Sequence, residues 1–331
     1  HWMVHSFPTR RSSDLEIPPS WPLFINEKSL RPNAETRIEP GEPLEVGFRG
    51  APGHVAEFLA PGGRWVRLEE EYKDIYTPTG IYRLNYVHTG AAEIAPATMR
   101  FRLRAHPEFV LPENAESKAM QVTLDSRFAI GVYSAERPRL MRVRDGETGY
   151  LIGGTHEVRL GGPYLAELPP GTQLRVVGRQ GSNYRVRLSP TLSAWIDINE
   201  VETLPPSAPM PNLAFTSLNV SGEGDFDLVS IPYPTAVPFS ARPARGALGG
   251  AAIEVDFWNA HYAQTWISHK ATAREVKEVT ATPVADAWLR LRIELRSKQL
   301  WGYRVEVKDG ALRILIRRPP ALSPEPGRPL K

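Results

Sequence analysis

The sequence predicts an all-β chain that contains several domains. The first observation is composition, because 32 prolines and 26 glycines among 331 residues end helices often and favour short strands joined by turns. The second is a series of short runs in which apolar and polar residues alternate, as they do in half-buried strands. The third is length, which exceeds that of one small β domain. Together these observations indicate two or three β domains in series.

The first fifteen residues are expected to lie outside the folded protein. The run Ser6-Phe7-Pro8-Thr9-Arg10-Arg11-Ser12-Ser13-Asp14-Leu15 resembles a translated sequencing-adapter oligonucleotide. On this interpretation residues 1–15 are an artefact, and the natural N-terminus with any signal peptide is lost. A disordered basic tail is the alternative.

Residues 16–106 are predicted to form an Ig-like β-sandwich, since several short strands separated by turn signals are typical of that architecture. The expected strands are Leu44–Phe48, Trp65–Leu68, Gly80–Val87 and Thr98–Ala105. Glu69–Asp74 is the one segment expected to form a helical turn. Residues 107–149 are predicted to be a β connector. Its expected strands are Met120–Leu124, Ala129–Tyr133 and Pro138–Val143.

Residues 150–206 form the clearest unit in the sequence. Its expected strands are Gln173–Gly178, Tyr184–Leu188, Ser193–Asp197 and Glu200–Leu204. This segment resembles the second half of a bacterial SH3-like barrel, with Tyr184 where the family usually has Trp and Ala194 where Gly usually precedes the aromatic residue. The resemblance implies an aromatic groove for an extended peptide, lined by Tyr184 and Trp195. Packing inside the barrel is an equally favoured role for both side chains.

Residues 207–320 are predicted to form a third β domain behind the Pro-rich linker Pro205–Pro211. Its expected strands are Phe226–Ile231, Ala252–Phe257, Glu275–Thr280, Trp288–Leu295, Gly302–Val307 and Leu312–Ile316. Asp309-Gly310 predicts a hairpin turn, because both residues adopt positive φ readily. Residues 321–331 are expected to be a second linker, leading to a catalytic domain that is missing here.

The end of the third domain carries a second resemblance. Lys298, Trp301, Gly302, Tyr303, Leu312, Ile316, Pro319 and Pro320 match the pattern K-x-x-W-G-Y followed by L, I and P-P. That pattern resembles the junction between the AMIN-like β domain and the hydrolase of bacterial N-acetylmuramoyl-L-alanine amidases. The resemblance implies a periplasmic or cell-envelope protein whose partner is peptidoglycan, through its glycan or its stem peptide. It implies zinc in the missing catalytic domain and no cofactor in this chain.

The residues themselves indicate no complete active site. None of the eight histidines lies in an Asp-Pro-Gly-His or His-Glu-x-x-His motif. Glu254, Asp256, His261 and His269 form the one cluster of histidine and carboxylate residues. A metal site there is conceivable, but a polar outer face of a strand is favoured, because alternation places both carboxylates opposite the apolar residues between them. Without cysteine, neither a disulfide nor a thiolate metal site is possible.

Aromatic residues are frequent in the third domain. They are Trp258, Tyr262, Trp266, Trp288, Trp301 and Tyr303. Trp and Tyr can stack on sugar rings while their polar atoms form hydrogen bonds, although most such residues fill domain cores. Trp258 and Trp266, expected on either side of a loop, are the candidates for exposed glycan contacts.

Charge and hydropathy restrict the classes of function. The net charge of +3 comes from 40 basic and 37 acidic residues that are interspersed, unlike the one-sided basic surface of a nucleic-acid binder. No run of about 18 apolar residues predicts a transmembrane helix. The favoured hypothesis is a non-catalytic region that targets an amidase to the cell wall. A regulatory or protein-interaction module that binds envelope proteins is the alternative, and a free-standing enzyme of unknown class is least favoured.

Overall fold

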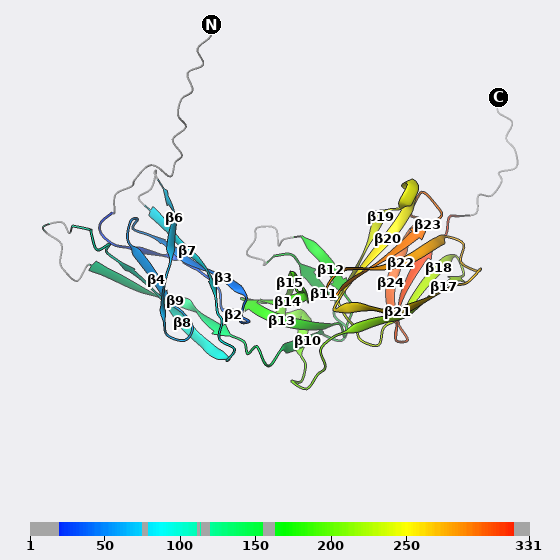
Figure 1. The fold of residues 1–331 in the computed structure, drawn as a ribbon, viewed down its shortest axis with the longest axis horizontal. Coiled ribbons are helices and arrows are strands. Elements are labelled where there is room, and N and C mark those ends of the chain that lie inside the picture. Colours follow the sequence, from blue (N-terminus) through cyan, green and yellow to red (C-terminus); the bar gives the residue numbers. More distant parts are fainter. Residues whose placement is uncertain (1–19, 75–78, 111–112, 114–119, 155–162, 321–331) are drawn as a thin grey trace, which may run out of the picture. The chain divides into compact units, whose positions relative to one another are not determined.

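The structure, a computed structural model, describes residues 20–74, 79–110, 113, 120–154 and 163–320. Strands dominate these residues throughout, which confirms the all-β, multi-domain prediction (Figure 1). The expected artefact at residues 1–15 and the expected linker at residues 321–331 lie outside the described residues. No helix in the described part of the chain is long and apolar enough to cross a membrane. Two compact units result, residues 1–137 with 177–181 and residues 138–176 with 182–331.

The first unit contains two packed sheets. One is four-stranded, in the order β1 (Ile25–Arg31), β3 (Pro43–Gly50), β7 (Thr79–Val87) and β6 (Glu69–Asp74). The other contains β2 (Thr36–Ile38), β9 (Gln121–Val132), β8 (Ile94–Arg104), β4 (Val55–Leu59) and β5 (Trp65–Arg67). Phe48 packs on Tyr82 of its own sheet, with ring centroids 5.3 Å apart. It also packs on Phe101 of the other sheet, with ring centroids 5.7 Å apart. These rings belong to one buried apolar cluster, which supplies the main stabilisation of such a sandwich.

Two sequence predictions for this unit differ from the structure. The prediction of a helical turn at Glu69–Asp74 is wrong, because this segment is strand β6 and pairs with β7. The two strands expected at Met120–Leu124 and Ala129–Tyr133 are one strand, β9, which pairs with β8 and runs parallel to β2. The connector therefore supplies a strand to the first unit, and its last expected strand forms β10 (Arg139–Val143) of the second unit.

The first part of the second unit is a mostly antiparallel sheet. Its strands are β10, β11 (Gly149–Ile152), β12 (Tyr164–Leu168), β13 (Gln173–Gln180), β14 (Asn183–Ser189), β15 (Leu192–Asp197) and β16 (Val201–Thr203). The end of β13, from Val177 on, belongs to the first unit. Strand order is β12-β11-β15-β14-β13, and β10 pairs with both β13 and β16. The hairpin between β13 and β14 turns at Gly181, which has a φ of 55°. The expected SH3-like barrel stays a prediction, while its four expected strands are all present.

Residues 213–317 form two further sheets. The five-stranded sheet has the order β21 (Ala260–His269), β17 (Leu213–Glu223), β18 (Phe226–Pro232), β25 (Ala311–Arg317) and β24 (Tyr303–Lys308). The four-stranded sheet has the order β19 (Phe239–Arg245), β20 (Ala251–Trp258), β23 (Trp288–Leu295) and β22 (Val276–Ala285). Phe215 and Phe257, one from each sheet, pack with ring centroids 4.9 Å apart within a single core. The predicted hairpin turn at Asp309-Gly310 is confirmed, since both residues have positive φ.

Candidate functional site

Tyr184 and Trp195 lie on opposite faces of their sheet. In the antiparallel pair of β14 and β15, Tyr184 is opposite the buried Ile196, whereas Trp195 is opposite Arg185. Side chains of directly opposed residues share a face, and successive residues alternate between faces. The two aromatic side chains therefore cannot line one peptide groove, and the predicted groove is wrong in this form. Tyr184 points to the side of Val186 and Ile196, which favours the packing role.

Trp195 lies instead near two exposed tyrosines that the sequence prediction did not single out. Trp195 pairs with Ile152 of β11, and Ile152 pairs with Tyr164 of β12. Tyr150 and Tyr164 are both exposed, with ring centroids 6.3 Å apart. Partial burial together with the carboxylate of Glu167 raises the pKa of Tyr164. No local pattern marks them, because neither GYLI nor YLAEL alternates apolar and polar residues.

Trp258 is buried, which corrects the expectation that it is an exposed contact residue. It ends β20 with 4% of its surface accessible, and its ring packs 6.3 Å from that of Trp288. The expected loop between Trp258 and Trp266 is a tight turn at Asn259, where φ is 56°. The indole Nε1 of Trp258 has no hydrogen-bond partner among the residues that the structure describes. A core role therefore fits Trp258, and it offers no surface to a glycan.

Trp266 is the most exposed of the predicted site residues. It lies in β21 with 76% of its surface accessible, and Tyr262 and Ile267 of the same strand are also exposed. β21 is an edge of the five-stranded sheet and, among the described strands, pairs only with β17, to which it is parallel. The strand therefore presents a large indole beside an edge that no other described strand covers.

The other edges of these two sheets carry features that block pairing with a further strand. β19 contains Pro243 and β22 contains Pro283, and proline removes a backbone donor from an edge. β24, at the opposite edge from β21, alternates the charged residues Arg304, Glu306 and Lys308. β21 contains neither proline nor lysine, arginine or carboxylate residues. It is thus the edge of these two sheets best suited to contact a ligand.

No protein-family model matches this chain. Comparisons with curated proteins and with solved structures also find no match. The case for a function therefore rests on the residues and their geometry.

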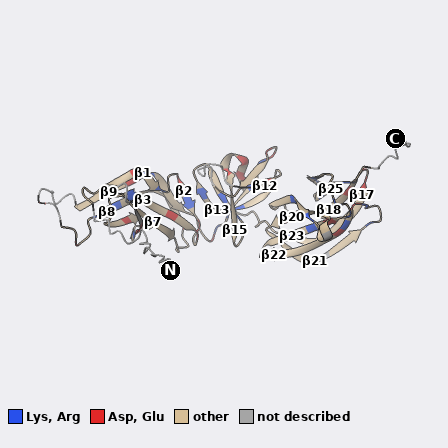
Figure 2. Ribbon diagram, turned by 90° about the horizontal axis from the view of Figure 1, so that it is seen from above, with Lys and Arg blue, Asp and Glu red and all other residues tan. Residues whose placement is uncertain are grey.

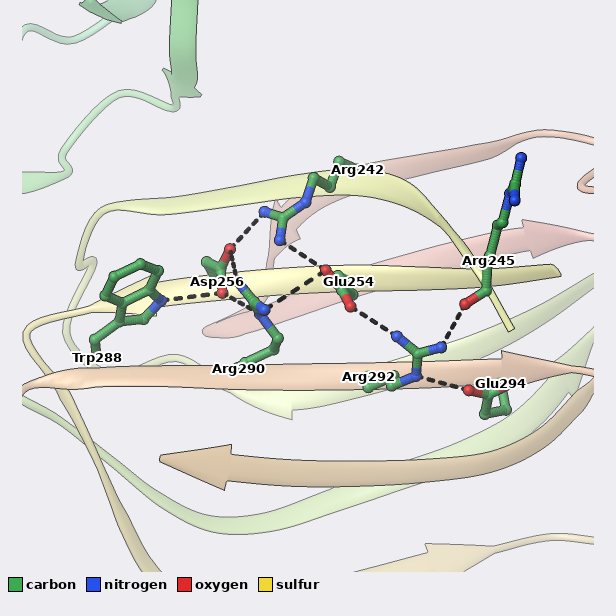
Figure 3. Close-up of polar contacts among 8 residues, drawn as sticks. All are labelled: Arg242, Arg245, Glu254, Asp256, Trp288, Arg290, Arg292 and Glu294. Carbon is green, nitrogen blue, oxygen red and sulfur yellow. Dashed lines mark hydrogen bonds and ion pairs between the residues drawn. The ribbon is translucent and has the colours of Figure 1, made fainter. Parts of the chain in front are cut away.

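The carboxylates Glu254 and Asp256 belong to an arginine–carboxylate ladder on the outer face of the four-stranded sheet (Figure 3). We use this name for Arg242, Glu254, Asp256, Arg290, Arg292 and Glu294. Arg290 Nε donates to Asp256 Oδ1 over 2.7 Å, and Trp288 Nε1 donates to the same oxygen over 3.0 Å. Arg292 Nη1 donates to Glu254 Oε1 over 2.7 Å. The prediction of a polar outer face is confirmed, and both carboxylates on it form ion pairs with arginines.

Asp256 is ionised in the ladder despite its burial. Burial by itself raises the pKa of this carboxyl, but hydrogen bonds from Arg290, Arg242 and Trp288 outweigh it, and the net pKa lies below its usual value. His261 lies elsewhere, in β21, with its Nδ1 2.8 Å from Asn212 Oδ1. Among the described residues no group of three or more His, Asp and Glu side chains is arranged to hold a metal ion. The four residues of the expected cluster are thus divided between two sheets.

A groove of about 510 Å³ within the second unit runs along β12, β19 and β24. Its lining includes three aromatic side chains, those of Tyr164, Phe239 and Tyr303. Two carboxylates, Glu167 and Glu306, also line it, and Glu306 is paired with Arg313 Nη1 over 2.8 Å. The mixture of aromatic rings and edge-strand backbone suits an extended chain better than a compact anion.

Proposed function

We propose that this chain is a non-catalytic region that binds peptidoglycan and so targets a cell-envelope hydrolase to the cell wall. Its parent would be an N-acetylmuramoyl-L-alanine amidase, whose zinc hydrolase domain follows the C-terminus, and the protein would act in the periplasm or cell envelope. The resemblance of residues 298–320 to the amidase junction supports the identity of the parent. Neither a zinc ligand set nor a catalytic role is assigned to residues of this chain.

The observation that carries the proposal is the exposed indole of Trp266 on an uncovered strand edge. Aromatic rings bind the apolar faces of sugar rings, and the indole N–H can donate a hydrogen bond to a hydroxyl group. A glycan strand repeats the same sugars many times, so several weak contacts on one chain add through their effective concentration. The exposed pair Tyr150 and Tyr164 would provide a second contact of the same kind.

The proposal is tested by sedimentation of the full chain with purified sacculi. We expect the wild-type chain to pellet and Trp266→Ala to weaken binding about tenfold, since loss of one stacked aromatic ring costs on the order of 1.4 kcal/mol. Val284→Ala is the matched control, because Val284 is exposed on β22, an edge strand of the other sheet. A wild-type chain that stays in the supernatant would refute the proposal.

The alternative is a protein-interaction module, in which a strand of a partner pairs with β21. This edge contains no proline, lysine, arginine or carboxylate residue that would oppose pairing with another strand, which favours that function specifically. Both functions use β21, but they use different parts of it. A glycan needs the indole of Trp266, whereas a pairing strand needs the backbone edge, and a charged substitution on the edge separates them.

A further inference from the structure

A concave basic site lies on the first unit, apart from every residue used above. A pocket of about 280 Å³ is formed on the outer face of the four-stranded sheet by β1, β3 and β7. Four of its lining residues are cations and none is a carboxylate. We call this site the basic pocket and define it by Lys28, Arg31, Arg49 and Arg83 around Gly47.

Strand register explains why the site is hollow. Gly47 of β3 is opposite Arg31 of β1 on one side and Arg83 of β7 on the other, so the three residues form one row across the sheet. A Cβ atom at Gly47 would lie 2.3 Å from the carbonyl oxygen of Tyr82, which excludes every side chain at this position. Arg83 Cγ lies 3.1 Å from the same Cβ position, so the Arg83 side chain extends over Gly47. Glu69 of β6 is opposite Arg83, so the complete row is Arg31, Gly47, Arg83 and Glu69, and the hollow lies beside Arg31 and Arg49.

Few carboxylates neutralise these cations. Arg83 has Glu45 and Glu71 as neighbours, both at 3.7 Å, which is longer than a hydrogen bond. Lys28, Arg31 and Arg49 form no ion pair with any of the residues that the structure describes, although Arg31 Nη1 donates to the carbonyl oxygen of its neighbour Leu30.

Arg83 is partly neutralised by its carboxylates, whereas Lys28, Arg31 and Arg49 are not. Glu27 precedes Lys28 in β1, but its carboxylate pairs with Arg127 Nε over 2.7 Å. Asn26, opposite Arg49, adds an amide that can donate hydrogen bonds. Four cations and an amide thus surround a volume that holds a small molecule, close to the lower limit of ligand pockets.

We propose that the basic pocket binds the diphosphate group of an ester. Guanidinium groups bind phosphate oxygens in a bidentate manner, and Arg31 and Arg49, which have no carboxylate partner among the described residues, can hold two adjacent phosphoryl groups. Arg31 is opposite Gly47, so Arg49 is its diagonal neighbour on the adjacent strand, roughly 7–8 Å away, a spacing that suits two linked phosphoryl groups better than a single small ion. The enclosed volume favours one compact group over an extended polyanion, which would need a basic stripe.

The test is isothermal titration of the full chain with sodium pyrophosphate, with orthophosphate as a comparison. We expect one site, weaker binding of orthophosphate, and a loss of about tenfold in affinity for each arginine replaced in Arg31→Gln and Arg49→Gln. Lys28→Gln is a second variant with the same expected direction. Arg64→Gln, in the exposed turn between β4 and β5, is the matched control and should bind as the wild type does.

Each outcome decides the proposal. Absence of pyrophosphate binding, or equal losses in Arg64→Gln, would overturn it. Neutral phosphatidylcholine vesicles that contain CDP-diacylglycerol, whose headgroup is a diphosphate ester, separate a membrane-linked from a soluble source of the diphosphate. Vesicle binding that is abolished by Arg31→Gln with Arg49→Gln supports the site with a lipid-linked ligand, whereas vesicle binding that both substitutions leave intact, without pyrophosphate binding, refutes it.

Discussion

Two sheet faces of this protein carry rows of arginine, and the rows have opposite surroundings. In the arginine–carboxylate ladder, Glu254 is opposite both Arg242 and Arg292, and every arginine has a carboxylate partner. In the basic pocket, the residue between Arg31 and Arg83 is a glycine. Basic and acidic residues are interspersed on strands of both units and nearly equal in number, so this difference depends on register and not on overall composition (Figure 2). The ladder stabilises its fold, and the pocket leaves its charges available to a ligand.

The largest change in stability is expected when a carboxylate of the arginine–carboxylate ladder is removed. Asp256→Ala should lower the free energy of unfolding of the second unit by about 3 kcal/mol, because a buried carboxylate that accepts from two arginines and an indole is lost. Urea denaturation followed by tryptophan fluorescence measures the change. Arg49→Gln in the pocket is the control, for which we expect a change of less than about 0.5 kcal/mol. Equal effects would mean that both rows are structural.

Acid should produce part of the same loss without a substitution. The pKa of Asp256 in the folded chain is below its ordinary value of 3.8, so its stabilisation is present above that pH and is lost as the pH falls through the depressed folded pKa. Asp227 responds in the same direction, because it accepts hydrogen bonds from three backbone N–H groups and from Arg318. We therefore expect the second unit to lose stability below about pH 4.

The measurement is the urea midpoint of the second unit between pH 7 and pH 2. Asp256→Asn should flatten this dependence, since an amide has no charge to lose. Glu275 opposes the trend slightly, because burial raises its pKa. A pH profile identical in Asp256→Asn and wild type would show that the ladder carboxylate contributes nothing to it.

A ligand should stabilise the other unit instead. If the basic pocket binds pyrophosphate, a free concentration ten times the Kd adds about 1.4 kcal/mol to the unfolding free energy of the first unit. The transition of the second unit should not move beyond the effect of ionic strength, which sodium sulfate at matched ionic strength measures. Stabilisation that persists in Arg31→Gln with Arg49→Gln would place the effect outside the pocket.

The sequence predicted strands best where one face is buried. The last seven residues of Trp288–Leu295 alternate strictly between apolar and charged, and the structure has β23 with the same bounds. Edge strands were harder to find. β21 was not predicted, because its pairing with β17 shifts register between Tyr262 and Trp266 and its residues do not alternate. Glu69–Asp74 carries no strand pattern of its own. It is a strand because it pairs with β7, where Glu69 is opposite Arg83.

Candidate residues were harder to predict than strands, because exposure and facing depend on the partner strand. Trp258 and Trp266 have the same chemistry and lie eight positions apart, yet one ends a central strand and is buried while the other lies on an edge. Tyr184 and Trp195 are both in predicted strands, and only the register between β14 and β15 places them on opposite faces. The basic pocket joins residues of three strands, so no local motif indicates it.

The smallest expected effect on stability distinguishes the two roles of β21. Ile267→Lys places a charge on the uncovered edge, and because Ile267 is exposed the unfolding free energy should change by less than about 0.5 kcal/mol. Strand pairing by a partner should be lost, because an edge lysine opposes it. Glycan binding should persist, because the indole of Trp266 is unchanged. Sedimentation with sacculi tests the glycan role: retained binding in Ile267→Lys together with loss in Trp266→Ala assigns the edge to glycan, whereas retained binding in Trp266→Ala removes the indole as the glycan contact and leaves strand pairing as the role of this edge.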